Sequence, residues 1–217
     1  MRSSKTAANI RGNESYENRN HQYQYPLASL HHGWARMQFV PSTASRNQPD
    51  SMLRKINISK DTALFSKCEK YRYILTRKFP NSNSGVCNFI MLNPSTADAE
   101  KNDPTVARCC KYAQRWGYGS LIVTNIFSYR ATDPKEMKAQ KDPVGKLNMK
   151  YIYKAASESD FIVCAWGTHG GYQNQGREVV EMLEEMQDRM HCLEITKHGH
   201  PKHPLYCRGD LKPATYQ

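Results

Sequence analysis

Four short apolar runs follow one another along the chain, and polar or turn-forming residues separate them. The runs are VCNFIML (86–92), SLIVTNI (120–126), DFIVCAW (160–166) and HCLEI (191–195). Continuous apolar runs of this kind are typical of β-strands that are covered on both faces of a sheet. The stretch YRYILTRKF (71–79) alternates instead, which predicts a half-buried or edge strand, and PNSNSG (80–85) predicts a turn.

Helical patterns lie between these strands. In residues 103–117, Asp103 is suited to cap a helix, Pro104 to occupy its first turn and Gly117 to end it. Further helices are predicted at 144–157 and at 175–190, the second because its apolar residues share one helical face. Because strands and helices alternate, we expect an α/β fold of three layers, α/β/α, with a mostly parallel central sheet.

Residues 1–55 are rich in Asn, Ser, Arg, Gln and His, and their apolar residues keep no sustained period. Such a segment buries too little surface to offset the entropy of ordering, so we predict a disordered, mildly basic tail. The tail is either an arm that contacts nucleic acid or a poorly constrained extension. Residues 56–217 have a length suited to a single domain.

The chain carries 31 Lys and Arg against 20 Asp and Glu, a formal charge of +11. This excess favours a polyanionic partner, nucleic acid above all, although a merely solubilising surface explains it equally well. No apolar stretch is long enough to span a bilayer and no secretory signal is visible, so we expect an intracellular protein with no membrane partner. The seven cysteines lie in apolar runs and on a predicted helix and include no C-x-x-C pair, so we expect reduced cysteines and no metal. No G-x-G-x-x-G follows the first buried strand and no P-loop is present, and we expect no organic cofactor.

In α/β sheets, ligands bind beyond the carboxyl ends of the strands. That rule selects four segments, which are NPSTAD (93–98), NIFSYRATDP (125–134), WGTHGG (166–171) and TKHGHPKHPLY (196–206). Taken alone, Asn93-Pro94 is readily explained as a turn, and the residues around His203 as a solvated basic loop. Asn125 is harder to explain in this way, because an amide that ends a buried strand needs partners for both its donor and its acceptor.

The order of four motifs changes this interpretation. MLNPS, IVTNIF, CAWG and KHPLY occur in the sequence order of the motifs of the uracil-DNA glycosylase superfamily, which the chain resembles over residues 86–207. More closely, residues 60–207 are similar to the family known as domain of unknown function 1643, through LNPSTAD, NDPT, WGYG, RATDP, AWG and HPLY. The closer family carries no established activity, so the expected function follows from the wider superfamily.

The resemblance implies roles for single residues. Asn93 would position or polarise the water that attacks the sugar C1′ atom, and His203 would donate to an oxygen of the leaving base. Asn125 would hydrogen-bond the edge of a base flipped from the stack. Leu205 and Tyr206 would form the wedge that fills the vacated stack.

The sequence also departs from the superfamily. Ser95, Thr96 and Asp98 stand where members often carry Gly or Tyr-His, which implies room for a base larger than uracil. The carboxylates of Asp98 and Asp103 are alternative activators of the water, and Asp98 is kept beside Asn93 and His203 as a candidate catalytic residue. His203-Pro204 is followed by Leu, so a hydroxyl expected on the phosphate is missing.

The remaining site residues complete the prediction. Pro94 and Phe127 join the substrate-binding set, and Arg130, Lys202 and Arg208 join the DNA-binding set. Phe127 and Tyr129 alternate after Asn125, so one of the two is expected to stack on a base while the other packs inward. We expect a monomeric DNA glycosylase-type enzyme that hydrolyses the N-glycosidic bond of an altered or hypermodified base, in DNA repair or phage defence. Two alternatives stay open: an enzyme of the same fold that acts on free modified nucleosides or nucleotides, and a non-catalytic module that binds nucleic acid.

Overall fold

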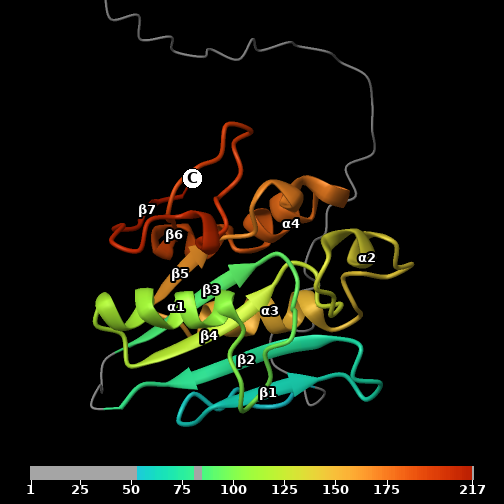
Figure 1. Cartoon of the computed structure of the whole chain (residues 1–217), viewed down its shortest axis with the longest axis horizontal. Helices are drawn as coiled ribbons and strands as arrows, with labels where there is room; N and C mark the ends of the chain where they lie inside the picture. The colour runs from blue at the N-terminus through green and yellow to red at the C-terminus, as the bar shows by residue number, and fades with distance from the viewer. Residues whose placement is uncertain (1–52, 81–84, 217) are drawn as a thin grey trace, which may run out of the picture. The chain divides into compact units, whose positions relative to one another are not determined.

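Residues 53–80 and 85–216 are described by the structure, a computed structural model, and within them seven strands form one mixed sheet. The strand order across the sheet is β1-β2-β4-β3-β5-β6-β7 (Figure 1). The strands are β1 Thr62–Phe65, β2 Arg72–Lys78, β3 Val86–Met91, β4 Ser120–Asn125, β5 Phe161–Cys164, β6 Met190–Cys192 and β7 Ala214–Thr215. These residues belong to the unit Pro49–Gln217, and the tail predicted over 1–55 lies almost wholly outside the described residues.

The four central strands, β4, β3, β5 and β6, run parallel to one another. At the edges the pairing is antiparallel, because β1 pairs with β2, β2 with β4, and β7 with β6 in that way. The prediction of a mostly parallel sheet is therefore correct for the centre and wrong for the edges. A short connection joins β1 to β2, and short connections suit antiparallel neighbours, whereas parallel strands need a longer crossover.

The alternating stretch 71–79 forms β2, which lies inside the sheet and not at its edge. The edge position is taken by β1, which pairs with β2 and which the apolar pattern did not predict. The polar side chains of β2 are buried with partners: the Thr76 hydroxyl lies 2.7 Å from that of Thr62 and donates to the carbonyl of Lys60. Alternation in this strand therefore reflects buried polar contacts and not a solvated face.

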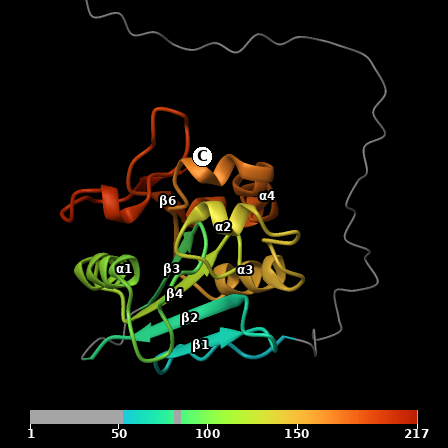
Figure 2. The same cartoon turned by 45° about the vertical axis from the view of Figure 1, so that its right-hand side comes forward.

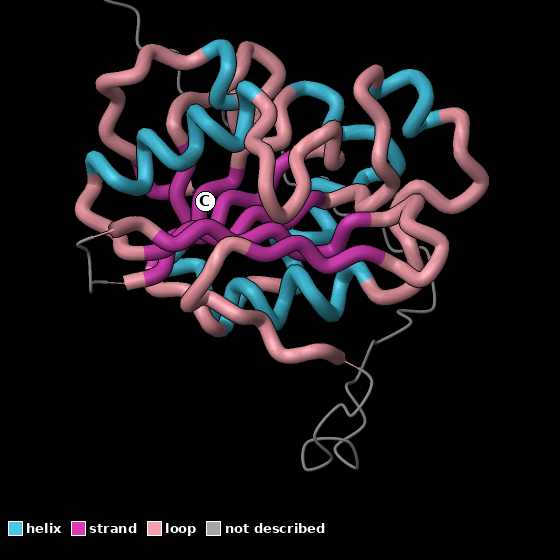
Figure 3. The backbone as a smooth tube through the Cα atoms, turned by 60° about the horizontal axis from the view of Figure 1, so that its bottom comes forward, coloured by secondary structure: helices cyan, strands magenta, loops and turns pink. Residues whose placement is uncertain are grey.

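Helices cover both faces of the sheet (Figures 2 and 3). On one face, α1 (Pro104–Arg115) packs Tyr112 into a cluster with Phe89 of β3. On the other face, α3 (Asn148–Ser157) and α4 (Gln175–Met182) share a cluster with Ile90. Successive residues of one strand thus point to opposite faces, as the geometry of a strand requires.

Two helices differ in length from their prediction. The helix predicted at 144–157 begins only at Asn148. Gly145 has φ +82°, which is not a helical conformation, and residues 146 and 147 form a turn before the helix. The helix predicted at 175–190 is α-helical only to Met182, and the chain then tightens into the 3-10 segment η3 (Glu184–Arg189). A pattern of apolar residues does not separate these two helix types when the same face stays buried.

The remaining elements are short. They are α2 (Pro134–Lys138), the 3-10 segment η2 (Thr168–Asn174) and the 3-10 segment η4 (Pro204–Tyr206). As predicted, the apolar runs place Cys87, Cys164 and Cys192 in the interior as free thiols. No helix described between residues 53 and 216 is long and apolar enough to cross a lipid bilayer.

Candidate functional site

A cavity of about 770 Å³ opens at the carboxyl ends of β3 and β5. Its lining comes from the turns after these two strands, the first turn of α1, the segment before α2 and the segment around η4. The chain runs from β3 to β4 on one side, and β5 lies on the other side of β3, so the strand order reverses here. In open α/β sheets this is the position at which ligands bind, and the volume lies in the range of small-molecule sites.

Asn93 lies in the turn after β3 and lines the cavity. Its amide nitrogen donates to the carbonyl oxygen of Ala131 over 2.7 Å and to that of Pro94 over 3.2 Å. Because both neighbours are acceptors, the nitrogen side of the carboxamide must face them. The carboxamide oxygen of Asn93 has no donor among the described residues, so it stays available as an acceptor.

His203 lines the same cavity from the segment that leads into η4. Its Nδ1 accepts the backbone N–H of Leu205 over 3.4 Å, which leaves the hydrogen of the neutral ring on Nε2. Burial lowers the pKa of His203 to about 4, and the nearby charge of Asp103 opposes this shift only in part. The imidazole is therefore neutral at physiological pH and offers an Nε2–H donor.

Asp103 also lines the cavity, as the cap of α1. Its carboxylate accepts the N–H of Val106 over 2.8 Å, as the sequence predicted for a capping residue, and the residue is 8 % exposed. The site therefore unites an amide oxygen, a carboxylate and a neutral imidazole in one cavity.

Asp98 does not line this cavity. Its carboxylate accepts the backbone N–H groups of Lys101 and Glu100, each over 2.8 Å, and these bonds lower its pKa. Of the two carboxylates considered as activators of the water, the structure brings Asp103 to the cavity and uses Asp98 to form a turn.

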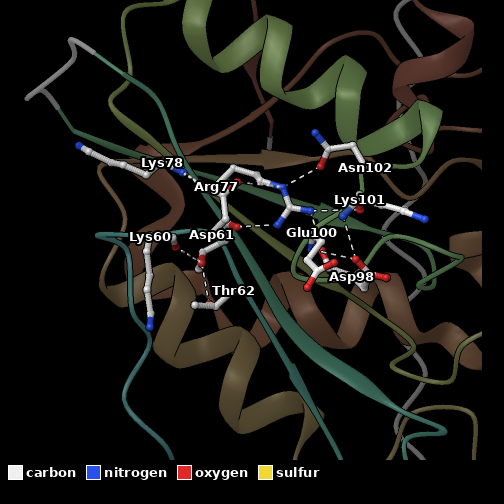
Figure 4. A network of polar contacts seen from close by, with 10 residues as sticks. Lys60, Asp61, Thr62, Arg77, Lys78, Asp98, Glu100, Lys101 and Asn102 are labelled. Carbon is white, nitrogen blue, oxygen red and sulfur yellow. Dashed lines mark hydrogen bonds and ion pairs between the residues drawn. The ribbon is translucent and has the colours of Figure 1, made fainter.

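A buried arginine fixes that turn (Figure 4). Arg77 of β2 donates to the side chain of Asn102 over 2.7 Å and to the carbonyl oxygens of Asp98 and Lys101 over 2.6 and 3.2 Å. The segment 98–102 leads directly into α1. Arg77 thus helps to hold Asp103 in place from outside the cavity.

Two residues predicted to contact a base, Asn125 and Phe127, do not line the cavity. Asn125 is 2 % exposed, and its carboxamide oxygen accepts from Nη2 of Arg72 over 3.2 Å. Phe127 is fully buried in the cluster that covers the α3 face of the sheet. Asn125 ends β4 and Phe127 follows it, and β4 lies on the far side of β3 from the point where the strand order reverses.

Of the predicted substrate-binding residues that follow Asn93, two line the cavity and one is buried outside its lining. Ser95 and Thr96 line the cavity, and the hydroxyl of Ser95 lies 3.4 Å from that of Thr132. Pro94 is buried behind them, where its carbonyl accepts the N–H of Ala131 over 2.9 Å. Pro94 therefore shapes the turn, whereas Ser95 and Thr96 line the cavity.

The predicted DNA-binding residues are brought together only in part. Lys202, Leu205 and Tyr206 line the cavity, and Leu205 and Tyr206 are 43 % and 75 % exposed. Arg130 lies over the ring of Phe65 and lines a neighbouring hollow. Arg208 lies outside the lining and pairs with Asp210 over 2.8 Å.

The cavity is also lined by residues for which the sequence predicted no role, among them Thr105, Thr132, Thr168 and His169. Nδ1 of His169 lies 3.2 Å from Nζ of Lys138, and its pKa is lowered, first by burial and then by that lysine. His169 lies shortly after the Trp-Gly pair that follows β5. This position at the carboxyl edge of the sheet is the sequence feature from which a place in the cavity could be predicted.

Within residues 53–80 and 85–216, no group of three or more His, Cys, Asp or Glu side chains is placed to hold a metal ion.

Comparisons with known proteins give a family but no named relative. No curated protein and no solved structure matches the chain. The model of the family described as "Protein of unknown function (DUF1643)" matches residues 72–205. That span runs from β2 into η4 and includes Asn93, Asp103 and His203. The chain therefore belongs to the DUF1643 family, as its motifs predicted.

Proposed function

We propose that the chain is a hydrolase of the DNA glycosylase type, which cleaves the N-glycosidic bond of an altered or hypermodified base in DNA. The observation that carries this proposal is the cavity that unites Asn93 with His203 at the carboxyl ends of β3 and β5. Repair of DNA and defence against phage DNA are both served by this reaction.

The three polar groups of the cavity suit the reaction. A water held by the oxygen of Asn93 attacks C1′ of the sugar, while the bond from C1′ to the base nitrogen breaks and its electron pair stays on the base. The Nε2–H of His203 stabilises the negative charge that develops on the base. The water gives one proton to the carboxylate of Asp103, which later releases it to solvent, and the departing base takes up one proton from solvent. The sugar thus gains the hydroxyl of the water, the base gains a hydrogen and Asp103 returns to its carboxylate form.

The size of the cavity supports a large base. A cavity of about 770 Å³ exceeds the needs of a pyrimidine, and Ser95 and Thr96 contribute hydroxyls to its wall. A base that carries an additional polar group would fill this space and bond to these hydroxyls. We therefore assign a bulky, modified base to the site in preference to uracil.

The proposal also includes the three-layer arrangement of the uracil-DNA glycosylase superfamily. Helices on both faces of the sheet and the order of the four motifs support it. The segments MLNPS, CAWG and KHPLY contribute to the cavity, whereas the Asn of IVTNIF does not line it. In this chain, recognition of the base is therefore assigned to other lining groups.

One observation favours the second candidate function, hydrolysis of free modified nucleosides. Lys202 is the one Lys or Arg in the lining of the described cavity, and its ammonium lies 2.6 Å from the carboxylate of Glu194. A lining with so little free positive charge suits a neutral nucleoside. A DNA substrate requires that the rim, through Leu205 and Tyr206, makes the contacts outside the cavity.

The proposal is tested by base release from DNA that contains uracil, alkylated, oxidised, glucosylated or otherwise hypermodified bases, with detection of abasic sites. Release from one class of DNA, lost in Asn93→Ala and His203→Ala, is the expected result. Asn57→Ala is the matched control, because Asn57 is an exposed asparagine outside the cavity. Wild-type rates in both site variants would overturn the assignment of the site, and release from free nucleosides alone would establish the second candidate.

A further inference from the structure

A second cavity, of about 170 Å³, lies beside the turn between β5 and α4. Trp166 forms part of the wall of both this small cavity and the large one. A Cβ built on Gly170 would fall 2.5 Å from Nε1 of Trp166, and one built on Gly176 would fall 2.8 Å from it. Both glycines line the small cavity and neither lines the large one, so the Nε1 edge of the indole faces the small cavity.

Among residues 53–80 and 85–216 the indole N–H of Trp166 has no hydrogen-bond acceptor, although the residue is only 2 % exposed. Its Nε1 is not one of the fully buried polar atoms without a partner, so the N–H reaches accessible space. The other described tryptophan differs, because Nε1 of Trp116 donates to the carbonyl of Leu211 over 3.4 Å. A buried indole N–H ordinarily has an acceptor. Trp166 therefore directs a donor without a protein partner toward a small cavity that is partly open to solvent.

The rest of the small cavity contains a helix N-terminus and two basic residues. It lies at the first turn of α4, an eight-residue helix whose capping residue, Asn174, makes no side-chain bond to the helix. The positive end of the helix dipole favours an anion there. Arg177 and His200 also line the cavity. The side chain of Arg177 is 72 % exposed and its Nε donates to the carboxylate of Glu181 over 2.7 Å, so only its two Nη groups remain for an anion. The acidic residue of this turn, Glu178, is not part of the lining.

We propose that this small cavity is an oxyanion site, which binds a phosphate group between the indole N–H of Trp166, the first turn of α4 and Arg177. A free phosphate ion and a phosphodiester of nucleic acid present the same oxygens to these donors. The site is distinct from the hydrolytic cavity and does not depend on the proposed activity. Because Trp166 is a common wall, a phosphate bound here contacts the ring that bounds the base-binding cavity.

The test is a titration of nitrogen-15-labelled protein with inorganic phosphate, followed through the indole N–H resonances. Trp166→Phe keeps an aromatic ring without the donor, and it identifies the Trp166 resonance by its loss. With sodium chloride keeping the ionic strength constant, the Trp166 resonance is expected to move downfield and to saturate. The Trp116 resonance should stay in place, because its N–H already has an acceptor.

Arg177→Gln should raise the phosphate midpoint about tenfold, since a charge-assisted bond is lost. Lys154→Gln is the matched control, because Lys154 and Glu158 form a helical ion pair of the same spacing as Arg177 and Glu181, away from the cavity. That variant should keep the wild-type midpoint.

A second titration uses an unmodified DNA oligonucleotide. A Trp166 shift at a lower concentration than inorganic phosphate requires would identify the nucleic acid backbone as the source of the phosphate, and a shift with the ion alone would identify a free anion. A Trp166 resonance that responds to neither, or that moves equally with chloride, would overturn the proposal. Equal phosphate midpoints in the wild type and in Arg177→Gln would also overturn it.

Discussion

Arg72 donates from Nη2 to the carboxamide oxygen of Asn125 over 3.2 Å, and both side chains are buried. Its Nη1 donates to the carbonyl of Ala97 over 2.9 Å, so one guanidinium joins β2, the turn after β3 and the end of β4. No carboxylate of the described residues forms an ion pair with it. Burial lowers the pKa of Arg72 to about 10, with the charge of Asp103 opposing the shift.

This contact predicts that Asn125 stabilises the fold. Asn125→Ala leaves a donor of Arg72 buried without its acceptor, so the free energy of unfolding should fall by about 2 kcal/mol. Urea unfolding of the purified variants measures this loss. Asn57→Ala, which removes an exposed asparagine that bonds only the N–H of Ser59, should change the same quantity by about 0.5 kcal/mol or less. Equal effects of the two substitutions would contradict a structural role for Asn125.

Asn125 also marks the limit of prediction from the sequence. Apolar runs located all four parallel strands of the centre, because burial on both faces leaves a continuous signal. The rule that ligands bind at the carboxyl ends then placed Asn93 and His203 at one cavity. That rule does not identify the two strands between which the strand order of the sheet reverses. A long-range partner such as Arg72, from an alternating strand, leaves no local pattern.

His203 predicts a pH dependence of stability. Its pKa is about 4 in the folded protein against 6.5 for the free side chain, because burial disfavours the charged ring. Between these values the unfolded chain binds more protons, so the free energy of unfolding rises with pH. The contribution is fully present above pH 6.5 and is lost as the pH falls to about 4, with a total of roughly 3 kcal/mol.

His203→Gln should remove that contribution, so its free energy of unfolding should fall less than that of the wild type across this window. Urea unfolding at several pH values measures the difference between the two proteins, in which the titration of all other groups cancels. His198→Gln replaces an exposed histidine of the same loop and should retain the wild-type slope. A wild-type slope in His203→Gln would show that the ring is solvated in the folded protein.

Gly170 predicts a steric limit beside Trp166. A Cβ at this position would lie 1.9 Å from Cδ1 of the indole, so Gly170→Ala must displace the ring that walls the large cavity. Overpacking of this kind should lower the free energy of unfolding by about 2–3 kcal/mol. Gly199→Ala is the comparison, because nothing lies within 4 Å of its Cβ and its φ of +78° costs about 1 kcal/mol. Thermal and urea unfolding rank the two variants, and a smaller loss for Gly170→Ala would contradict the packing.

The exposed pair at the rim distinguishes DNA from a free nucleoside as the substrate. Tyr206 is 75 % exposed and lines the mouth of the cavity, a position from which an aromatic ring can stack on a base or enter a gap between bases. If DNA is the substrate, Tyr206→Ala should lower kcat/KM for the oligonucleotide about tenfold or more, since the ring contacts bases next to the one that is released. The effect on a free nucleoside that carries the same base should be much smaller, because this substrate has no neighbouring bases.

Tyr153→Ala is the matched control for that experiment. Tyr153 is a 41 % exposed tyrosine on α3, outside the cavity, so its loss should leave the ratio of DNA to nucleoside hydrolysis unchanged. A single kcat/KM on one substrate would not separate a rim contact from a general loss of folded enzyme, whereas the ratio cancels any change in the active fraction. If Tyr206→Ala left this ratio at its wild-type value, the rim would have no part in binding DNA. The weakly charged lining, with Lys202 paired to Glu194, would then favour a free nucleoside as the substrate.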